Sequence, residues 1–191
     1  FKRLVHAERV GALPRRIIHQ ALEMFADEGL GGGWRPHFLR EELSAWYTFS
    51  TSTDTEVLLK AYHRWGDQMF TKLDGMYAVV ILDWKKSTLI AARATIGIKP
   101  FYYAYQDQTF IYGSEPKAVL NGLGTNGHLD WEHASEFLAL GIMDHDEGTF
   151  FREVKQLEGG HFLKLNLKDG SMKKVEYRKR PQVHNGFETS V

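Results

Sequence analysis

The run LDGMYAVVIL, from Leu73 to Leu82, changes from a turn sequence into an uninterrupted apolar segment. Leu73-Asp74-Gly75 has a turn composition, whereas Met76 to Leu82 is apolar on both alternating faces. A strand with one face in solvent alternates apolar and polar residues, because successive side chains point in opposite directions. Met76 to Leu82 is therefore predicted to be a strand that is covered on both faces.

Strand-like runs on the C-terminal side predict an antiparallel arrangement around this segment. Lys85-Lys86-Ser87 and Asp169-Gly170 have turn compositions, and apolar runs flank each of them. Such short connections favour antiparallel neighbours. The strands predicted after the central one are Leu89–Ala94, Phe101–Tyr105, Thr109–Tyr112, Leu163–Leu167 and Met172–Tyr177.

Amphipathic helices are predicted on both sides of the strands. Thr53-Asp54-Thr55-Glu56 has the S/T-x-x-E form of a capping box, and the apolar stripe behind it predicts a helix from Asp54 to about Trp65. Asp54 then occupies the first helical position, where the helix dipole favours a charged carboxylate. Further helices are predicted over Pro14–Glu28, Pro36–Trp46 and Asp130–Leu140. This order of elements predicts an α+β protein with antiparallel sheets between helices.

Composition excludes several classes of function. The 191 residues contain 24 Lys plus Arg and 24 Asp plus Glu, so the chain lacks the positive excess on which nucleic-acid binding depends. No apolar run is long enough to span a bilayer, and no signal-peptide core follows Phe1. A cytoplasmic protein without nucleic-acid or membrane partners is therefore predicted. Zero cysteines exclude a disulfide, a thiolate metal site and a cysteine nucleophile within these residues.

Four sequence blocks resemble a known family in their order and spacing. The blocks are Thr53–Leu59 (TDTEVLL), Leu73–Val79 (LDGMYAV), Arg93 with Gly97–Ala104 (GIKPFYYA), and Gly113–Ala118 (GSEPKA). Together they resemble the N-terminal glutaminase domain of glutamine-hydrolysing asparagine synthetases, which are class II glutamine amidotransferases. The resemblance extends from about Leu39 to Tyr177.

The resemblance implies a fold, a reaction and a set of site residues. The family fold is the N-terminal-nucleophile αββα four-layer sandwich, whose first strands would be missing or replaced here. In the family, an N-terminal cysteine attacks the side-chain amide of glutamine, and the ammonia passes to a second domain that activates aspartate with ATP. By resemblance, Asp54 binds the α-amino group of glutamine; alternatively, Asp54 only starts a helix. The residues that support the site by resemblance are Arg93, Gly97, Pro100, Ser114 and Glu115.

Departures from the family pattern predict that these residues do not hydrolyse glutamine. Phe1 cannot replace a nucleophile, and Leu30-Gly31-Gly32 stands where the family has its Asn-Gly-Glu oxyanion segment. Losing an oxyanion donor costs about two to three orders of magnitude in rate. Ala94 replaces the aspartate of an Arg-Asp pair that we interpret as a structural ion pair. No Ser-Gly-Gly-x-Asp-Ser pyrophosphate loop occurs, so no cofactor is predicted in this chain, and ATP and Mg²⁺ are expected only in a separate synthetase domain.

Three functional hypotheses remain open. The chain is the glutaminase portion of an asparagine synthetase-like protein, or a non-catalytic pseudo-glutaminase that binds an amino acid or braces a partner domain, or the front domain of a lactam-forming synthetase relative. The expected partners are glutamine or a similar small amino acid, and either a synthetase domain or a second copy that covers exposed strand edges. The predicted organisation is an N-terminal helix and Gly-rich joint over 1–33, a glutaminase-like domain over 34–178, and a tail over 179–191.

Two histidine-containing regions are interpreted as ordinary surface. Asp144-His145-Asp146-Glu147 has the composition of a metal site, but adjacent loop residues seldom converge without partners from elsewhere in the chain. A solvated acidic loop is therefore predicted there. His128 and His133 are spaced unsuitably for one helix face and are interpreted as polar positions. No metal site is predicted.

Overall fold

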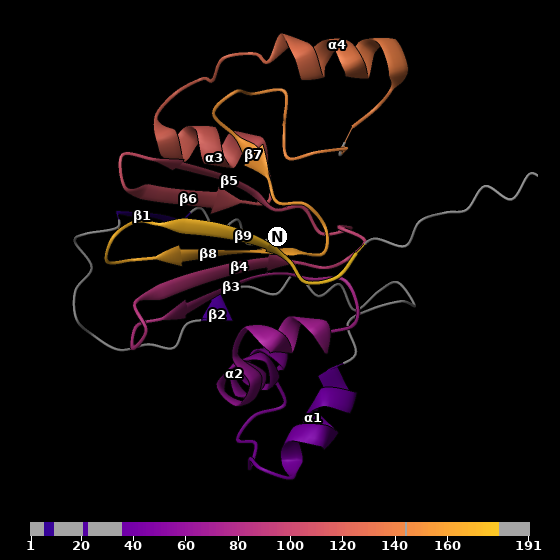
Figure 1. The fold of residues 1–191 in the computed structure, drawn as a ribbon, viewed down its shortest axis with the longest axis vertical. Helices are drawn as coiled ribbons and strands as arrows, with labels where there is room; N and C mark the ends of the chain where they lie inside the picture. The colour runs from indigo at the N-terminus through magenta and orange to yellow at the C-terminus, as the bar shows by residue number, and fades with distance from the viewer. Residues whose placement is uncertain (1–5, 10–20, 23–35, 144, 180–191) are drawn as a thin grey trace, which may run out of the picture.

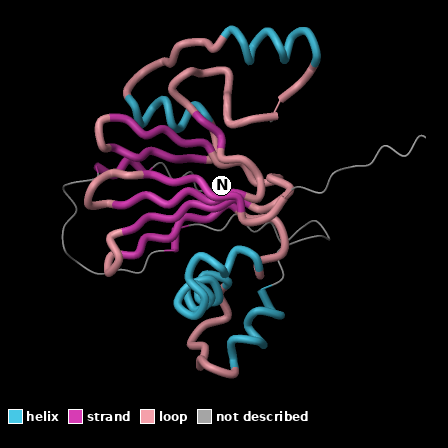
Figure 2. Tube along the Cα trace, in the orientation of Figure 1, coloured by secondary structure: helices cyan, strands magenta, loops and turns pink. Residues whose placement is uncertain are grey.

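The computed structural model describes residues 6–9, 21–22, 36–143 and 145–179, which form two antiparallel sheets with helices outside them (Figures 1 and 2). The five-stranded sheet contains, in spatial order, β2 (Ala21–Leu22), β3 (Ala78–Asp83), β4 (Thr88–Arg93), β8 (His161–Asn166) and β9 (Met172–Glu176). The four-stranded sheet contains β1 (His6–Arg9), β6 (Thr109–Gly113), β5 (Tyr102–Gln106) and β7 (Lys155–Gln156). The helices are α1 (Pro36–Ser44), α2 (Asp54–Trp65), the 3₁₀ helix η1 (Gly66–Thr71), α3 (Pro116–Leu123) and α4 (Trp131–Leu140).

Strand β3 is buried along its whole length. Val79 lies in an apolar cluster with Leu58 of α2 and Phe70 of η1, whereas the next residue, Val80, lies in a second cluster with Phe110 of the other sheet. Consecutive residues of β3 therefore face a helical layer and a second sheet in turn. The predicted strand with two covered faces is confirmed.

The four-stranded sheet is covered on both faces by the same alternation. Tyr103 of β5 and Phe110 of β6 pack between the two sheets. Ala104 and Ile111 point the other way and pack against Val119 of α3. The layers thus follow one another as α1 and α2, the five-stranded sheet, the four-stranded sheet, and α3 (Figure 1). The predicted α+β fold with antiparallel sheets between helices is confirmed.

The first part of the chain departs from its predicted helix. Within the predicted helix Pro14–Glu28, the structure has the strand Ala21–Leu22, and the rest of that helix lies outside the described residues. The apolar spacing fits a helix, but Ala21 and Leu22 pair with Ile81 and Val80 at the edge of β3. An unpaired strand edge favours pairing with another strand, and the local spacing of apolar residues does not reveal such a distant partner. β1 likewise pairs with β6. Strands from the first 33 residues therefore lie beside the β3–β4 hairpin and beside the β5–β6 hairpin.

The helices after the strands differ in how they attach. α3, which the sequence did not predict, begins with Pro116 and ends at Leu123, and Gly124 in the left-handed conformation caps it. α4 matches its prediction, and the Asp130 carboxylate accepts a hydrogen bond from the Glu132 amide at 3.1 Å. However, none of the residues of α4 is buried, and α4 lies outside the layered body in Figure 1. No helix of the described segments has both the length and the apolar character needed to cross a membrane.

Candidate functional site

Asp54 is half-buried at the first position of α2, where two neighbouring side chains fix the approaching loop. The Glu56 carboxylate accepts hydrogen bonds from the backbone amides of Ser50 at 2.9 Å and Thr51 at 2.7 Å. The Arg40 guanidinium donates to the carbonyl oxygens of Thr51 at 2.8 Å and Thr53 at 3.0 Å. The turn before Asp54 is therefore held from both sides, which fixes the position of this carboxylate.

The charge of the first turn of α2 is also fixed. Hydrogen bonds from Lys60 and from Ser50 and Thr51 hold the pKa of the Glu56 carboxyl far below its usual range. The Thr53 hydroxyl accepts from the Glu56 amide at 3.4 Å and caps the helix, as the capping motif predicts. A helix N-terminus favours negative charge, so the end of α2 that carries Asp54 suits a carboxylate that binds a cationic group.

Arg93, at the end of β4, supports a turn rather than a ligand. Its buried guanidinium donates to the carbonyl oxygens of Lys99 at 2.7 Å, Leu157 at 2.7 Å and Gly97 at 2.5 Å. Gly97 has φ +74°, and a Cβ there would lie 3.3 Å from Arg93 Cζ, so glycine allows the turn to close over the guanidinium. Pro100 follows this segment and lies two residues before Tyr102, where β5 begins.

Ala94 lies on the opposite side of the chain from the Arg93 guanidinium. Ala94 belongs to the cluster beneath α2, whereas the Arg93 side chain reaches the turn and Leu157. Backbone carbonyls bind the guanidinium, so its three donor nitrogens are used without a carboxylate at position 94. The replaced aspartate of the family pattern therefore leaves no buried cation without partners.

Ser114 and Glu115 connect β6 to α3. Ser114 is half-buried, and Glu115 is the N-cap of α3, where its carbonyl oxygen accepts from the Ala118 amide at 3.0 Å. The structure thus distributes the predicted site residues over three places. Asp54 lies in the outer layer of α1 and α2, Arg93 with Gly97 at the end of the five-stranded sheet, and Ser114 with Glu115 next to the opposite outer layer.

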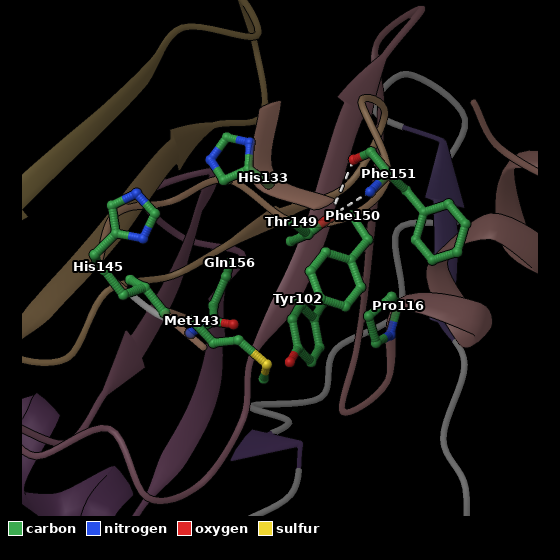
Figure 3. Close-up of a pocket in the computed structure, with 11 residues that line it drawn as sticks. Tyr102, Pro116, His133, Met143, His145, Thr149, Phe150, Phe151 and Gln156 are labelled. Carbon is green, nitrogen blue, oxygen red and sulfur yellow. Dashed lines mark hydrogen bonds between the residues drawn. The ribbon is translucent and has the colours of Figure 1, made fainter. Parts of the chain in front are cut away.

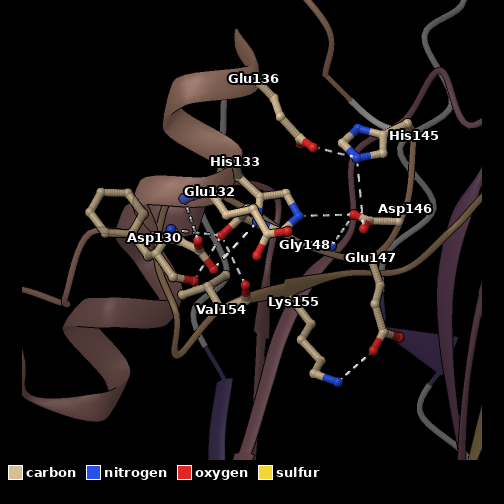
Figure 4. Close-up of polar contacts among 12 residues, drawn as sticks. Asp130, Glu132, His133, Glu136, His145, Asp146, Glu147, Gly148, Val154 and Lys155 are labelled. Atoms are coloured by element: carbon tan, nitrogen blue, oxygen red, sulfur yellow. Dashed lines mark hydrogen bonds and ion pairs between the residues drawn. The ribbon is translucent and has the colours of Figure 1, made fainter. Parts of the chain in front are cut away.

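A cluster that the sequence interpretation did not recognise lies between α4 and the following loop (Figure 4). His133 Nε2 lies 3.2 Å from Asp146 Oδ1, and its Nδ1 lies 3.3 Å from Asp130 Oδ2. His145 Nε2 lies 3.3 Å from Glu136 Oε2. Burial by itself would lower the pKa of His133, but the carboxylates of Asp146 and Asp130 outweigh it and raise that pKa.

The two histidines of this cluster also line a pocket of about 150 Å³ (Figure 3). Aromatic and apolar side chains form most of its wall, and Tyr102 and Gln156 add polar groups from β5 and β7. The sequence carried one signal for the cluster, because His133 and Glu136 are three residues apart and share a helix face. Of the acidic loop, Asp144 lies outside the described residues, and Glu147 instead pairs with Lys155 at 2.5 Å.

Residues 33–178 match the family model described as "Glutamine amidotransferase domain". The chain belongs to this family, and it is a class II glutamine amidotransferase domain related to the N-terminal domain of asparagine synthetases.

Two curated relatives show this relationship. Asparagine synthetase [glutamine-hydrolyzing] 3 of Bacillus subtilis is 35% identical over 133 residues, which are 69% of this chain and 22% of that protein. The putative asparagine synthetase [glutamine-hydrolyzing] 2 of Methanocaldococcus jannaschii is 30% identical over 133 residues, covering 69% of this chain and 26% of that protein. The chain thus spans only about a quarter of the length of these relatives.

A solved structure shows the same fold. The glutamine phosphoribosylpyrophosphate amidotransferase of Bacillus subtilis superimposes with a TM-score of 0.53 at 21% identity, over 82% of this chain and 31% of that one.

Proposed function

We propose that this domain binds glutamine as the amidotransferase-like part of an asparagine synthetase-like protein, and that the 191 residues have no glutaminase activity of their own. The observation that carries the proposal is the fixed position of Asp54 at the start of α2, within the block that resembles the glutamine-binding segment of the family. A carboxylate there would pair with the α-ammonium group of glutamine. Family membership supports glutamine over other amines.

The absence of a thiol separates binding from hydrolysis. Class II amidotransferase chemistry needs a cysteine whose sulfur attacks the amide carbon and whose amino group accepts the proton. The chain contains no cysteine, so these residues cannot form the thioester intermediate. The likeness to the phosphoribosylpyrophosphate amidotransferase supports the finer assignment to the N-terminal-nucleophile αββα fold. A domain that keeps the fold but has no nucleophile could still bind glutamine without hydrolysing it.

A second role, bracing a synthetase domain, is supported by the surface of α4. Trp131, Leu138 and Leu140 are 68%, 81% and 67% exposed, which is unusual for large apolar side chains brought together on one short helix. The curated relatives are several times longer than this chain. We infer that α4 packs against a domain that follows in such proteins, where ATP and Mg²⁺ would be used.

Titration calorimetry with L-glutamine tests the binding proposal. Saturable binding is expected for the wild-type chain, and Asp54→Asn should weaken it at least tenfold, or about 1.4 kcal/mol, because the amide keeps the shape but loses the charge. Asp107→Asn is the matched control. Asp107 lies in the turn between β5 and β6 at φ 50°, a conformation that asparagine tolerates, so binding should not change.

Three results would contradict the proposal. Wild-type chain that binds no glutamine removes the binding role, and equal affinities for wild type and Asp54→Asn remove the role of Asp54. Release of glutamate and ammonia from glutamine by the purified chain would overturn the predicted lack of hydrolysis. D-Glutamine serves as the ligand control, since a site that positions the α-ammonium group should distinguish the two enantiomers.

A further inference from the structure

Three side chains with metal-binding chemistry converge between α4 and the loop that follows it (Figure 4). One donor atom each from His133, Glu136 and His145 lies within 4.8 Å of the other two. His133 and Glu136 project from the same face of α4, and His145 reaches them from the loop. Two imidazoles and a carboxylate suit zinc and neighbouring transition metals, whereas Mg²⁺ and Ca²⁺ prefer oxygen donors alone.

A carboxylate lies beside the second nitrogen of His133. Asp130 Oδ2 is 3.3 Å from Nδ1 without a hydrogen bond between them, and Nε2 points into the cluster, where it lies 3.2 Å from Asp146 Oδ1. Histidine ligands in metal sites commonly have their second nitrogen held by a carboxylate, which fixes the tautomer and the ring. Asp130 is in the position of such a supporting group.

Glu136 supplies a carboxylate oxygen that lacks a hydrogen bond. Oε2 is buried and accepts no hydrogen bond from the described residues, although His145 Nε2 lies only 3.3 Å away. A carboxylate oxygen that is shielded from water is stabilised by a cationic or hydrogen-bonding neighbour, and here that neighbour is the imidazole of His145. A cation placed between this oxygen and the imidazole nitrogens would be a stronger partner.

The separation of two of the donor atoms fits a small tetrahedral ion, and the third donor lies within 4.8 Å of both. With bonds of about 2.0–2.1 Å, donors around zinc lie about 3.3 Å apart. The Glu136 and His145 donor atoms have this separation. Asp146 borders the cluster through two different oxygens, because Oδ1 lies 3.2 Å from His133 Nε2 and Oδ2 lies 3.8 Å from His145 Nε2. The Gly148 amide holds Asp146 Oδ1 at 2.7 Å, and a Cβ at Gly148 would lie 1.9 Å from His133 Nε2. Glycine is therefore needed for the loop to reach the cluster.

We propose that His133, Glu136 and His145 bind one Zn²⁺ ion beside the carboxylate of Asp146. The ion would join α4, which has no buried residue, to the loop from 145 to 149. The site lies in the loop and helix beyond the four-stranded sheet, whereas Asp54 lies at the start of α2, so zinc binding and glutamine binding can be tested separately. This proposal does not depend on the proposed function.

The test is a zinc titration of the tag-free 191-residue chain after treatment with EDTA. One equivalent of Zn²⁺ is expected to bind by calorimetry and to raise the thermal unfolding midpoint with increasing concentration. Co²⁺ should give the intense visible absorption of a tetrahedral site. His145→Ala should weaken binding at least tenfold, and Asp130→Asn about 10–100-fold as a supporting residue.

His128→Ala is the matched control. His128 is a histidine that also pairs with a carboxylate, that of Glu153 at 2.5 Å, but it is not one of the three residues of the cluster. It should leave zinc binding unchanged. His145 lies in a partly exposed loop, so its variant is expected to fold even where a change at His133 disturbs α4; circular dichroism checks this. The proposal is overturned by the absence of stoichiometric zinc binding, by equal effects of His128→Ala and His145→Ala, or by displacement of zinc by millimolar Mg²⁺.

Discussion

The half of the molecule around α2 and β3 and the region around α4 are built on different principles. In the first, Leu58, Phe70 and Val79 are at most 1% exposed and lie in one continuous apolar cluster. In the second, Leu138 is 81% exposed, and the contacts between helix and loop are ion pairs such as His133 with Asp146. The first half closes on itself, whereas the second presents its apolar side chains outward.

This difference separates a region that is stabilised by apolar burial from one with little buried apolar surface. Apolar burial stabilises the motif-bearing half without any partner. Exposed ion pairs contribute little, so the contacts of α4 should add little to the stability of the fold. The two regions should therefore respond differently to substitution, and the following variants test that difference in order of expected effect.

The largest effect is expected for Arg93→Ala. Three backbone carbonyl oxygens, those of Gly97, Lys99 and Leu157, would lose a charged donor in a buried site, which should lower the free energy of unfolding by about 3–5 kcal/mol. Urea denaturation measures this. Arg93→Lys should recover only part of this lost free energy, because an ammonium group keeps the charge but cannot reproduce the planar fork of the guanidinium. Arg152→Ala, at an exposed position beyond α4, should stay within about 0.5 kcal/mol.

A matched pair of leucines compares the two regions directly. Leu58→Ala, at 1% exposure, should destabilise the protein by about 2–5 kcal/mol through lost burial and a cavity. Leu138→Ala, at 81% exposure, should change stability by less than about 0.5 kcal/mol. Thermal and urea unfolding give both values. Similar losses at the two sites would mean that α4 is covered in solution, and the comparison would fail.

The smallest effect is expected from acid. Burial alone would raise the pKa of Asp83, but hydrogen bonds from the Lys86 amide and the Tyr62 hydroxyl outweigh it and lower that pKa. A carboxyl whose pKa is lowered by folding stabilises the folded state at any pH above its pKa in the unfolded chain, which is about 3.9. This contribution is lost as the pH falls through the pKa of the folded state. Asp83→Asn should therefore flatten the decline in unfolding free energy below about pH 4.

Glu153 gives the corresponding test in the other region. Its pKa is lowered by hydrogen bonds from the His128 backbone and ring, so the sign of its acid effect is the same. The Glu153 carboxylate connects its own loop only to residue 128, so Glu153→Gln should change amide exchange near α4. The free energy of global unfolding should stay unaltered. A global change in Glu153→Gln would show that the α4 region unfolds together with the body.

The sequence predicted the elements that depend on neighbouring residues and missed those that depend on contacts between distant ones. β3 and α2 were predictable, because an apolar run and a capping motif are local signals that the packing reinforces. The strand at Ala21–Leu22 was not, since its partners in β3, Ile81 and Val80, lie far away in the sequence. The same holds for the cluster of His133 and His145, whose members meet only when the loop folds back on α4. Asp54 was placed correctly at a helix start, while its ligand remains a proposal.

The Arg93 contact also bears on how the chain can change in length. Its NH1 donates to the Leu157 carbonyl across 64 residues, and the Gly160 amide donates to the carbonyl of Arg93 itself at 3.2 Å. The segment carrying β5, β6, α3 and α4 therefore leaves and returns to one point beside β4. Closing a loop of this size becomes only a few tenths of a kcal/mol harder when several residues are added. Insertions around α4 should thus be tolerated far better than insertions between β3 and β4.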